Sequence, residues 1–176
     1  MGEYRITLPD VHQHQVHYTV CFGDGATVHP FTTILEGTMI GKACLIADSV
    51  SIGRRVQIGE GCRIQAHTAI CDGAVIGAYV FIGSNVSLTD CDAPHLRDRT
   101  QEVHCPPRID DDVVIGCNAV VRPGVHIGQG AQIGCGAVVT RDVPAGWTVV
   151  GNPARRLVRS VRRLVLMNEA GEVADG

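Results

Sequence analysis

The sequence predicts an all-β solenoid, a parallel β-helix built from six-residue repeats. Three features carry this prediction. An aliphatic side chain recurs at every sixth position, a small or β-branched side chain comes four positions after each of them, and glycine often follows the aliphatic residue directly. A period of six fits neither an amphipathic helix nor one alternating strand, so each repeat is expected to form a short strand and a turn.

The aliphatic series sets the frame of the repeats. Before a single interruption its members are Val28, Ile34, Ile40, Ile46, Ile52, Ile58, Ile64, Ile70, Ile76, Ile82 and Leu88, and after it they are Ile109, Ile115, Val121, Ile127, Ile133 and Val139. The small series comprises Thr32, Thr38, Cys44, Val50, Val56, Cys62, Thr68, Ala74, Val80 and Val86. Both series are expected to face inward, so that stacked coils share one core. The glycines, interpreted as turn residues, are Gly41, Gly53, Gly59, Gly77, Gly83, Gly116, Gly128 and Gly134.

The chain divides into three parts in order. Residues 1–15 precede the regular series and are expected to form a lead-in or cap. Residues 16–150 form the β-helix. Residues 151–176 are expected to form a short capping α-helix and a polar tail, because Pro153 suits a first helical turn. The apolar stripe of this helix would be Leu157, Val161, Leu164 and Val165.

The repeat is interrupted once, at residues 89–107. The next aliphatic residue is due at position 94, which is Pro94, and regular spacing returns only at Ile109. This stretch holds prolines, histidines and several charges, so it is expected to leave the prism as a protruding loop. Loops on rigid scaffolds often carry function, and the sequence therefore predicts the active site here.

Composition narrows the class of protein. The chain has 176 residues, a net charge of −3 and only 4% aromatic residues, which suits the thin coils of a solenoid and gives no sign of nucleic-acid binding. The sequence has no apolar run of membrane-spanning length and no secretory segment at its start, so a cytoplasmic protein is expected. Its eight cysteines include no CxxC pair, and Cys44 and Cys62 are interpreted as buried small residues.

From Val16 to Val158 the repeats, together with the ending "VVIGCNAVVRPGVHIGQGAQIGCGAVVTRDVPAGWTVVGNPARRL", resemble the hexapeptide-repeat acyltransferases. The resemblance implies a left-handed parallel β-helix with three faces per coil; the left hand comes from the family alone, since parallel crossovers generally favour the right. It also implies acetyl-CoA as cosubstrate and a homotrimer that binds the coenzyme between subunits.

Two family patterns place candidate residues in the loop. Galactoside-type O-acetyltransferases have a catalytic histidine shortly after "NV[ST]L"; here "NVSL" is followed by His95, two residues later than in that pattern. Nucleotide-sugar N-acetyltransferases have "FTND…PR", and this chain has "LTDC…PH", which puts Asp90 at the asparagine position. His95 is the candidate general base, Asp90 the candidate acceptor-binding or catalytic carboxylate, and His104 a second candidate for binding the acceptor.

The ending of the repeats matches the coenzyme-binding part of the family. Small residues at Cys135, Gly136 and Ala137 are expected to let the pantetheine arm approach the main chain. Arg141 matches the basic residue of the family turn "T[KR]D", and Arg155 matches that of "NPxR". Both are expected to bind coenzyme phosphates, for which a guanidinium is well suited.

The resulting hypothesis is an acetyl-CoA-dependent acetyltransferase that N-acetylates an amino sugar, in the first place a nucleotide-linked one. O-acetylation of a sugar or another small hydroxyl compound is the alternative. Two other classes remain open: a γ-class carbonic anhydrase and a non-catalytic β-helix scaffold. The first needs histidines five apart in the solenoid, whereas the chain offers that spacing only at His12 and His17, so no metal is expected.

Overall fold

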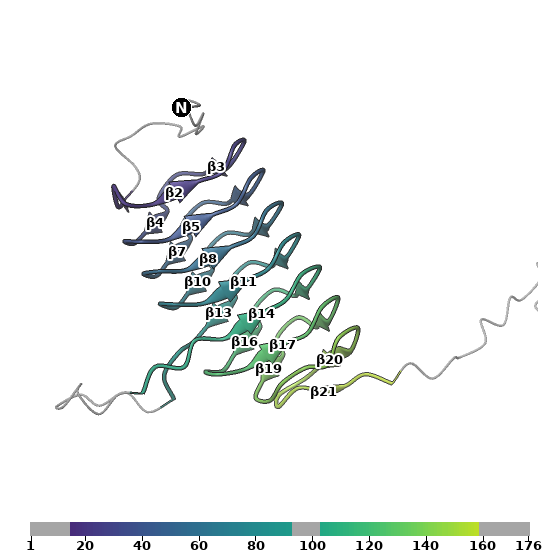
Figure 1. Ribbon diagram of the computed structural model, residues 1–176. Coiled ribbons are helices and arrows are strands. Elements are labelled where there is room, and N and C mark those ends of the chain that lie inside the picture. Colours follow the sequence, from purple (N-terminus) through teal and green to yellow (C-terminus); the bar gives the residue numbers. More distant parts are fainter. Residues whose placement is uncertain (1–14, 93–102, 159–176) are drawn as a thin grey trace, which may run out of the picture.

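The computed structural model describes residues 15–92 and 103–158. These residues form about seven coils of short strands (Figure 1), and no helix occurs among them. The strands are β1 (Gln15–Val16), β2 (Cys21–Phe22), β3 (Thr27–Val28), β4 (Thr33–Ile34), β5 (Met39–Ile40), β6 (Leu45–Ile46), β7 (Ser51–Ile52), β8 (Gln57–Ile58), β9 (Arg63–Ile64), β10 (Ala69–Ile70), β11 (Val75–Ile76), β12 (Phe81–Ile82), β13 (Ser87–Leu88), β14 (Arg108–Ile109), β15 (Val114–Ile115), β16 (Val120–Val121), β17 (His126–Ile127), β18 (Gln132–Ile133), β19 (Val138–Val139), β20 (Thr148–Val150) and β21 (Arg155–Arg156). The predicted all-β solenoid is confirmed.

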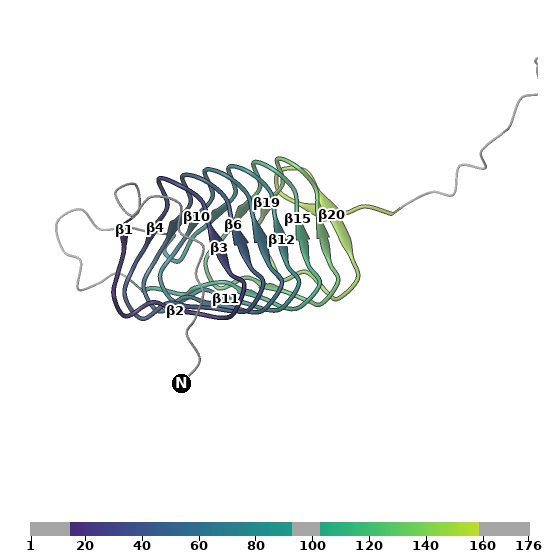
Figure 2. The ribbon, with the colours of Figure 1, turned by 90° about the horizontal axis from the view of Figure 1, so that it is seen from above.

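Three sheets form the faces of the prism. The first sheet has the order β1-β4-β7-β10-β13-β16-β19, the second β17-β14-β11-β8-β5-β2, and the third β21-β20-β18-β15-β12-β9-β6-β3. Each coil visits the sheets in turn, and Figure 2 shows the coils stacked behind one another. We call the turns from the first to the second sheet the first corner, those from the second to the third sheet the second corner, and those from the third back to the first the third corner.

Parallel pairing holds neighbouring coils in register. Ser51 pairs with Ala69 and Ala69 with Ser87, so equivalent positions are eighteen residues apart in uninterrupted coils. Across the interruption the offset is thirty-three residues, because β11 pairs with β14 and brings Val75 opposite Arg108. The excursion therefore adds fifteen residues without shifting the inward and outward positions.

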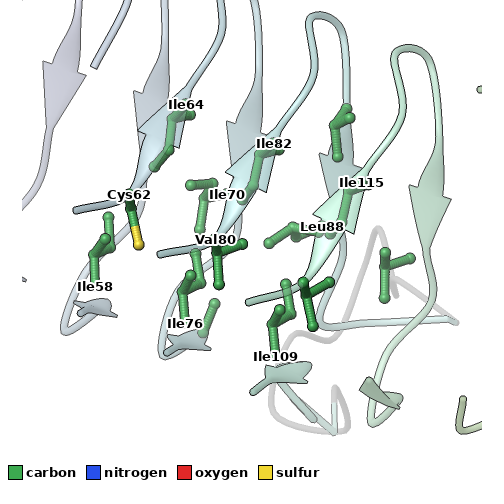
Figure 3. Close-up of a cluster of buried hydrophobic side chains, with 14 of the residues drawn as sticks. Ile58, Cys62, Ile64, Ile70, Ile76, Val80, Ile82, Leu88, Ile109 and Ile115 are labelled. Carbon is green, nitrogen blue, oxygen red and sulfur yellow. The ribbon is translucent and has the colours of Figure 1, made fainter. Parts of the chain in front are cut away.

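The core consists of the two predicted inward series. Ile34, Ile46 and Ile64 are completely buried, and Figure 3 shows such side chains stacked layer upon layer. The small series adds polar bonds to this apolar core. The Thr38 hydroxyl donates to the Gly53 carbonyl of the next coil at 2.8 Å, and the buried Cys62 thiol donates to the Gly77 carbonyl at 3.1 Å. The interpretation of Cys44 and Cys62 as buried small residues is confirmed.

The glycines that follow the aliphatic residues are interpreted above as turn residues, but the structure gives a different reason for them. A Cβ atom at Gly59 would lie 2.5 Å from the carbonyl of Gly77, and one at Gly41 would lie 2.5 Å from the amide nitrogen of Glu60. Close stacking of coils thus excludes a side chain at these corners. The left-handed turn residue comes two positions later, for example Gly61 at φ 68°.

The prediction of a C-terminal helix is wrong for the part of it that the structure describes, residues 151–158. Arg155–Arg156 forms strand β21, which pairs antiparallel with β20. The chain reverses at Gly151, whose φ is 93°, and the Leu157 amide then donates to the Thr148 carbonyl at 2.7 Å. Pairing with the sheet replaces the hydrogen bonds that a helical turn would need here. The remainder of the predicted helix, from residue 159, and most of the lead-in, residues 1–14, lie outside the described residues.

Within the described ranges, the structure offers no helix with the length and apolarity needed to cross a membrane.

Candidate functional site

The interruption opens from the first corner, between β13 and β14. Its two described ends, residues 89–92 and 103–107, lead out of the stack in Figure 1. They are tied together where they leave the prism: the Cys105 amide donates to the Asp90 carbonyl at 2.7 Å, and the Gly124 amide of the next coil donates to the Cys105 carbonyl at 2.6 Å. These two bonds fix the base of the excursion to the rigid coils.

Two sequence-predicted residues meet at this base. His104 Nδ1 lies 2.9 Å from Asp90 Oδ2, and the Asp90 side chain is only 20% exposed. A carboxylate that accepts a hydrogen bond from an imidazole fixes the orientation of the ring. His95, the other predicted catalytic residue, lies outside the described residues.

The Asp90–His104 pair lines an open hollow of about 390 Å³ at the first corner. Its lining residues are Arg55, Asp72, Gly73, Asp90, His104 and Pro106. Pro106 stands over Gly73, where a Cβ atom would lie 3.2 Å from the proline ring, so the absence of a side chain at Gly73 gives the returning chain room. The sequence analysis missed Arg55 and Asp72. The eighteen-residue period would have found Asp72, because it lies one coil before Asp90 in the same corner position.

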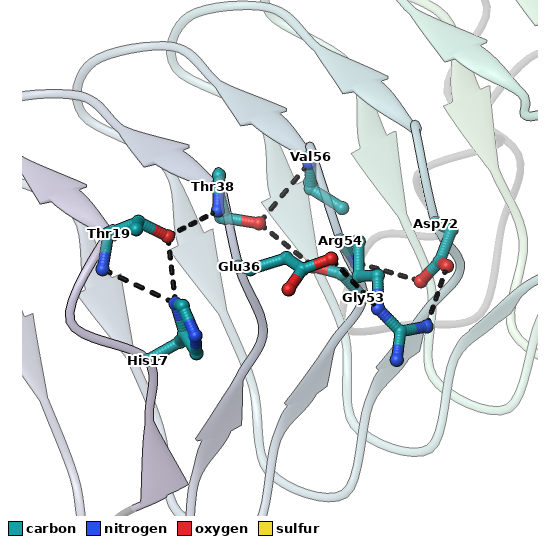
Figure 4. A network of polar contacts seen from close by, with 9 residues as sticks. His17, Thr19, Glu36, Thr38, Gly53, Arg54, Val56 and Asp72 are labelled. Carbon is teal, nitrogen blue, oxygen red and sulfur yellow. Dashed lines mark hydrogen bonds and ion pairs between the residues drawn. The ribbon is translucent and has the colours of Figure 1, made fainter.

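Asp72 is held by the coil before it. The Arg54 amide donates to Asp72 Oδ1 at 2.7 Å, and Arg54 Nη1 lies 3.3 Å from Asp72 Oδ2. Arg54 also lies 3.4 Å from Glu36, which extends this row of charges along the corner (Figure 4). The Asp72 carboxylate, which lines the hollow, is thus already bound by Arg54.

The thiol next to the hollow is not suited to act as a nucleophile. Burial raises the pKa of Cys71 to about 12, and the negative charges of Asp90 and Asp72 act in the same direction. A thiol with that pKa stays protonated near neutral pH, and the thiolate is the reactive form. The polar chemistry of the hollow therefore rests on its histidine, carboxylates and arginine.

A second contact braces the loop base. Arg122, which begins the next turn of the first corner, donates from Nε and Nη2 to the two carboxylate oxygens of Asp92 at 3.1 and 2.6 Å. Two parallel bonds of this kind fix orientation better than a single contact.

The small residues expected to bind the coenzyme lie at the third corner. Cys135 is exposed, Gly136 has φ 68° with open space where a Cβ atom would be, and Ala137 is completely buried. The Gly136 amide already donates to the Cys117 carbonyl at 2.8 Å, and the Ala137 amide donates to the Gly134 carbonyl at 3.2 Å. Contacts to a ligand here would therefore use the carbonyl groups of Cys135 and Gly136 rather than these two amides.

The two candidate phosphate-binding arginines lie around the last coil. Arg141 and Arg155 line a smaller hollow of about 170 Å³, with Trp147 and Val149 among its other lining residues. The Arg156 guanidinium lies over the Trp147 ring, 4.2 Å from its centroid. Arg141 belongs to the first corner, like Asp90, and β19 before it is two strands along the first sheet from β13.

A further pair that the sequence analysis did not identify lies on the second sheet. His126 Nε2 is 2.8 Å from Asp110 Oδ2, and Arg108 Nε is 3.3 Å from Asp110 Oδ1. Burial raises the pKa of Asp110, but the hydrogen bonds and charges of His126 and Arg108 outweigh it and hold that pKa below its usual value. In the described part of the chain, no three His, Cys, Asp or Glu side chains converge as ligands for a metal ion.

Comparisons with known proteins agree on one family. The family model described as "Bacterial transferase hexapeptide (six repeats)" matches residues 55–90 and 106–141. A hexapeptide-repeat-containing acetyltransferase from Vibrio cholerae, solved with acetyl-coenzyme A, is 30% identical over 69% of this chain and 70% of its own, with a TM-score of 0.61.

Two other relatives are more distant or shorter matches. A perosamine N-acetyltransferase from Caulobacter crescentus, in complex with CoA and GDP-perosamine, shares the fold at 21% identity over 84% of this chain and 54% of its own, with a TM-score of 0.52. A 2,3,4,5-tetrahydropyridine-2,6-dicarboxylate N-acetyltransferase from Staphylococcus aureus is 46% identical over 70 residues, which are 40% of this chain. The matched stretch covers 25% of the length of that relative.

Proposed function

The chain belongs to the hexapeptide-repeat acetyltransferase family, whose members use acetyl-CoA, and from this premise we propose that it transfers an acetyl group to the amine of a small acceptor. The acceptor class that we propose is an amino sugar, in the first place a nucleotide-linked one. The observation that carries the proposal is the Asp90–His104 pair, which lines a hollow at the base of the one excursion from the solenoid.

The proposed chemistry needs few groups. The amine nitrogen attacks the thioester carbonyl, the new N–C bond forms, the C–S bond breaks, and the coenzyme leaves as its thiol. The His104 imidazole, whose Nδ1 lies 2.9 Å from Asp90 Oδ2, is the proposed base that takes the proton of the attacking amine. Asp90 also provides the negative charge that attracts an ammonium group. His95, which the resemblance places in the catalytic role, is the other candidate base.

O-acetylation is the second candidate, and the same pair favours it. A hydroxyl group near neutral pH is a weak nucleophile without a base, whereas an amine of suitable pKa can react once it is unprotonated. A histidine oriented by a carboxylate is the arrangement that activates a hydroxyl group. Any screen for the acceptor should therefore include a neutral sugar alcohol.

The proposed coenzyme contacts favour a site between subunits. In one prism the carbonyl groups of Cys135 and Gly136 lie at the third corner, while Asp90 and His104 lie at the first corner, across the width of the first sheet. A second prism placed alongside would bring its third corner to the hollow. We therefore propose a homotrimer, in which Arg141 and Arg155 bind the phosphates of the coenzyme.

The experiment that tests the activity is an acceptor screen. Purified protein is incubated with acetyl-CoA and a panel of amino sugars, nucleotide-linked amino sugars and sugar alcohols, while release of the coenzyme thiol and the mass of the product are followed. We expect a product heavier by one acetyl group from an amine acceptor. Binding of acetyl-CoA without acetylation of any acceptor would count against the activity, and a stable monomer in sedimentation would count against the intersubunit site.

A further inference from the structure

Among the described residues, the hollow is lined by one arginine whose side chain has no hydrogen-bond or ion-pair partner. In residues 15–92 and 103–158, the Arg55 side chain makes no ion pair or hydrogen bond, although it lines the hollow together with Asp90 and His104. Its neighbour Arg54 differs, since it contacts both Glu36 and Asp72. The two adjacent arginines thus differ: Arg54 braces the corner, whereas the Arg55 side chain has no such contact among the described residues.

The backbone around Arg55 makes room for its side chain. Arg55 occupies the left-handed turn position of the first corner at φ 53°, and the equivalent residues of the coils before and after it are Gly37 and Gly73. A Cβ atom at Gly37 would lie 3.3 Å from Arg55 Cγ, so the arginine stem covers the space that this glycine leaves. A non-glycine residue at this φ costs on the order of 1 kcal/mol, which the corner tolerates here.

The other charges of the hollow are already paired. Asp72 is bonded to Arg54, and Asp90 is bonded to His104 at 2.9 Å. Neither carboxylate neutralises Arg55. Arg55 is one of the residues that line the hollow. A guanidinium fork matches the geometry of a phosphate or carboxylate group, which it can bind through two parallel hydrogen bonds.

We propose that Arg55 binds an anionic group, phosphate or carboxylate, of the acceptor whose amine reaches the Asp90–His104 pair. This inference rests on the proposed function and narrows its substrate class: the acceptor is an amine that carries a negative charge elsewhere in the molecule. A neutral amino sugar would lack the contact with Arg55 and would bind less tightly.

The test compares amine acceptors that carry an anionic group with a neutral one. The value of kcat/KM is measured for glucosamine, glucosamine 1-phosphate, a UDP-linked amino sugar and an amino-sugar uronic acid, with wild type, Arg55→Gln, Arg55→Lys and the control Arg63→Gln. Arg63 is an exposed arginine of strand β9 in the third sheet, away from the hollow. The phosphate and carboxylate arms show which anion is preferred.

We expect wild type to prefer the matching anionic acceptor over glucosamine by ~10-fold or more, the size of effect that a charged hydrogen bond of about 1.5 to 3 kcal/mol produces. Arg55→Gln should remove most of this preference through KM, Arg55→Lys should retain part of it, and Arg63→Gln should keep the wild-type ratio. Equal losses on neutral and anionic acceptors in Arg55→Gln, or no preference in wild type, would overturn the assignment.

A binding measurement separates this inference from the acetyltransfer itself. UDP, glucosamine 1-phosphate and glucuronic acid are titrated into wild type and Arg55→Gln, and calorimetry or the NMR signal of the Arg55 Nε–H group is followed. If no acceptor is acetylated but one of these anions binds wild type at least tenfold more tightly than Arg55→Gln, the acetylation proposal fails and the Arg55 site stands. If acceptors are acetylated but the variant binds every anion as wild type does, the Arg55 site fails and the activity stands. Absence of both acetylation and binding overturns both.

Discussion

Two histidine–aspartate pairs with almost equal contact distances lie in different surroundings. His104 and Asp90 are 2.9 Å apart at the base of the loop, and His126 and Asp110 are 2.8 Å apart on the second sheet. The first pair lines a hollow together with Arg55, whose side chain has no ion-pair partner within residues 15–92 and 103–158. The second shares its carboxylate with Arg108 and lines neither of the two hollows described above.

The difference teaches that the hydrogen bond alone does not mark a functional site. In the second pair both oxygens of Asp110 are engaged by neighbouring side chains, and the contacts connect adjacent coils of one sheet. Such exposed ion pairs add little to stability, commonly ~0 to 1 kcal/mol. In the first pair, the polar groups converge on open space at the place where the chain departs from its repeat. We therefore expect the first pair to affect turnover and the second to affect only stability.

The largest expected effect is on catalysis. His104→Asn should lower kcat by ~10²-fold if His104 is the general base, whereas the matched change His126→Asn should stay within about twofold of wild type. Steady-state kinetics on the best acceptor checks this. Equal kcat values for the two variants would remove the distinction between the pairs and leave His95 as the candidate base.

Asp90→Asn sharpens the same comparison. It restores the asparagine found in the amino-sugar pattern, so the variant should keep most of its activity if Asp90 only orients the acceptor, and lose ~10-fold or more if its charge supports His104. Steady-state kcat/KM of the variant on the best acceptor distinguishes the two roles.

The second-largest effect concerns the coenzyme. Arg141→Ala and Arg155→Ala should each weaken acetyl-CoA binding by ~1.5 to 3 kcal/mol, the usual loss for a charged hydrogen bond, while Arg108→Ala on the second sheet should not change it. Calorimetric titration measures these affinities directly. If all three variants bind acetyl-CoA alike, Arg141 and Arg155 are no more than solvated surface residues.

A smaller effect is expected from the brace of the loop base. Arg122→Ala removes both bonds to Asp92, an exposed contact of ~1 kcal/mol at most. Because that contact positions the excursion rather than the acceptor, kcat/KM should fall by no more than about fivefold. Hydrogen exchange of residues 103–107 should increase in the same variant, and unchanged exchange would show that the main-chain bonds at Asp90 and Cys105 hold the base alone.

The smallest effect is the pH-dependent stability of the second pair. The pKa of Asp110 is held below its usual value of 3.8, so the carboxylate stabilises the fold above that pH, and this contribution is lost as the pH falls through the lowered pKa. Since the side chains of His126 and Arg108 are 47% and 69% exposed, Asp110→Asn should lower the free energy of unfolding by only ~0.5 kcal/mol at pH 6. Denaturant unfolding of wild type and variant should converge once the pH has fallen below the lowered pKa of Asp110. A difference that persists there would have another cause.

The sequence predicted those features that repeat and missed those that depend on stacking. The aliphatic period identified the solenoid and the point where it breaks, because every coil must fill the same narrow core. Asp90 was found by its motif, but Arg55 and Asp72 belong to other coils and reach the hollow only through the eighteen-residue stacking of the first corner. The C-terminal helix was predicted from an apolar stripe, which cannot reveal that β20 offers its edge to β21.

The two main-chain bonds at the loop base have a consequence for how such proteins diversify. Asp90 and Cys105 are joined directly, and Cys105 is joined to Gly124 of the following coil, so the stack regains its register whatever lies between these points. An exchange of residues 91–104 for a segment of another length would leave every inward-facing position unchanged. The excursion can therefore change in length and sequence while the coils that present Arg141 and Arg155 keep their register.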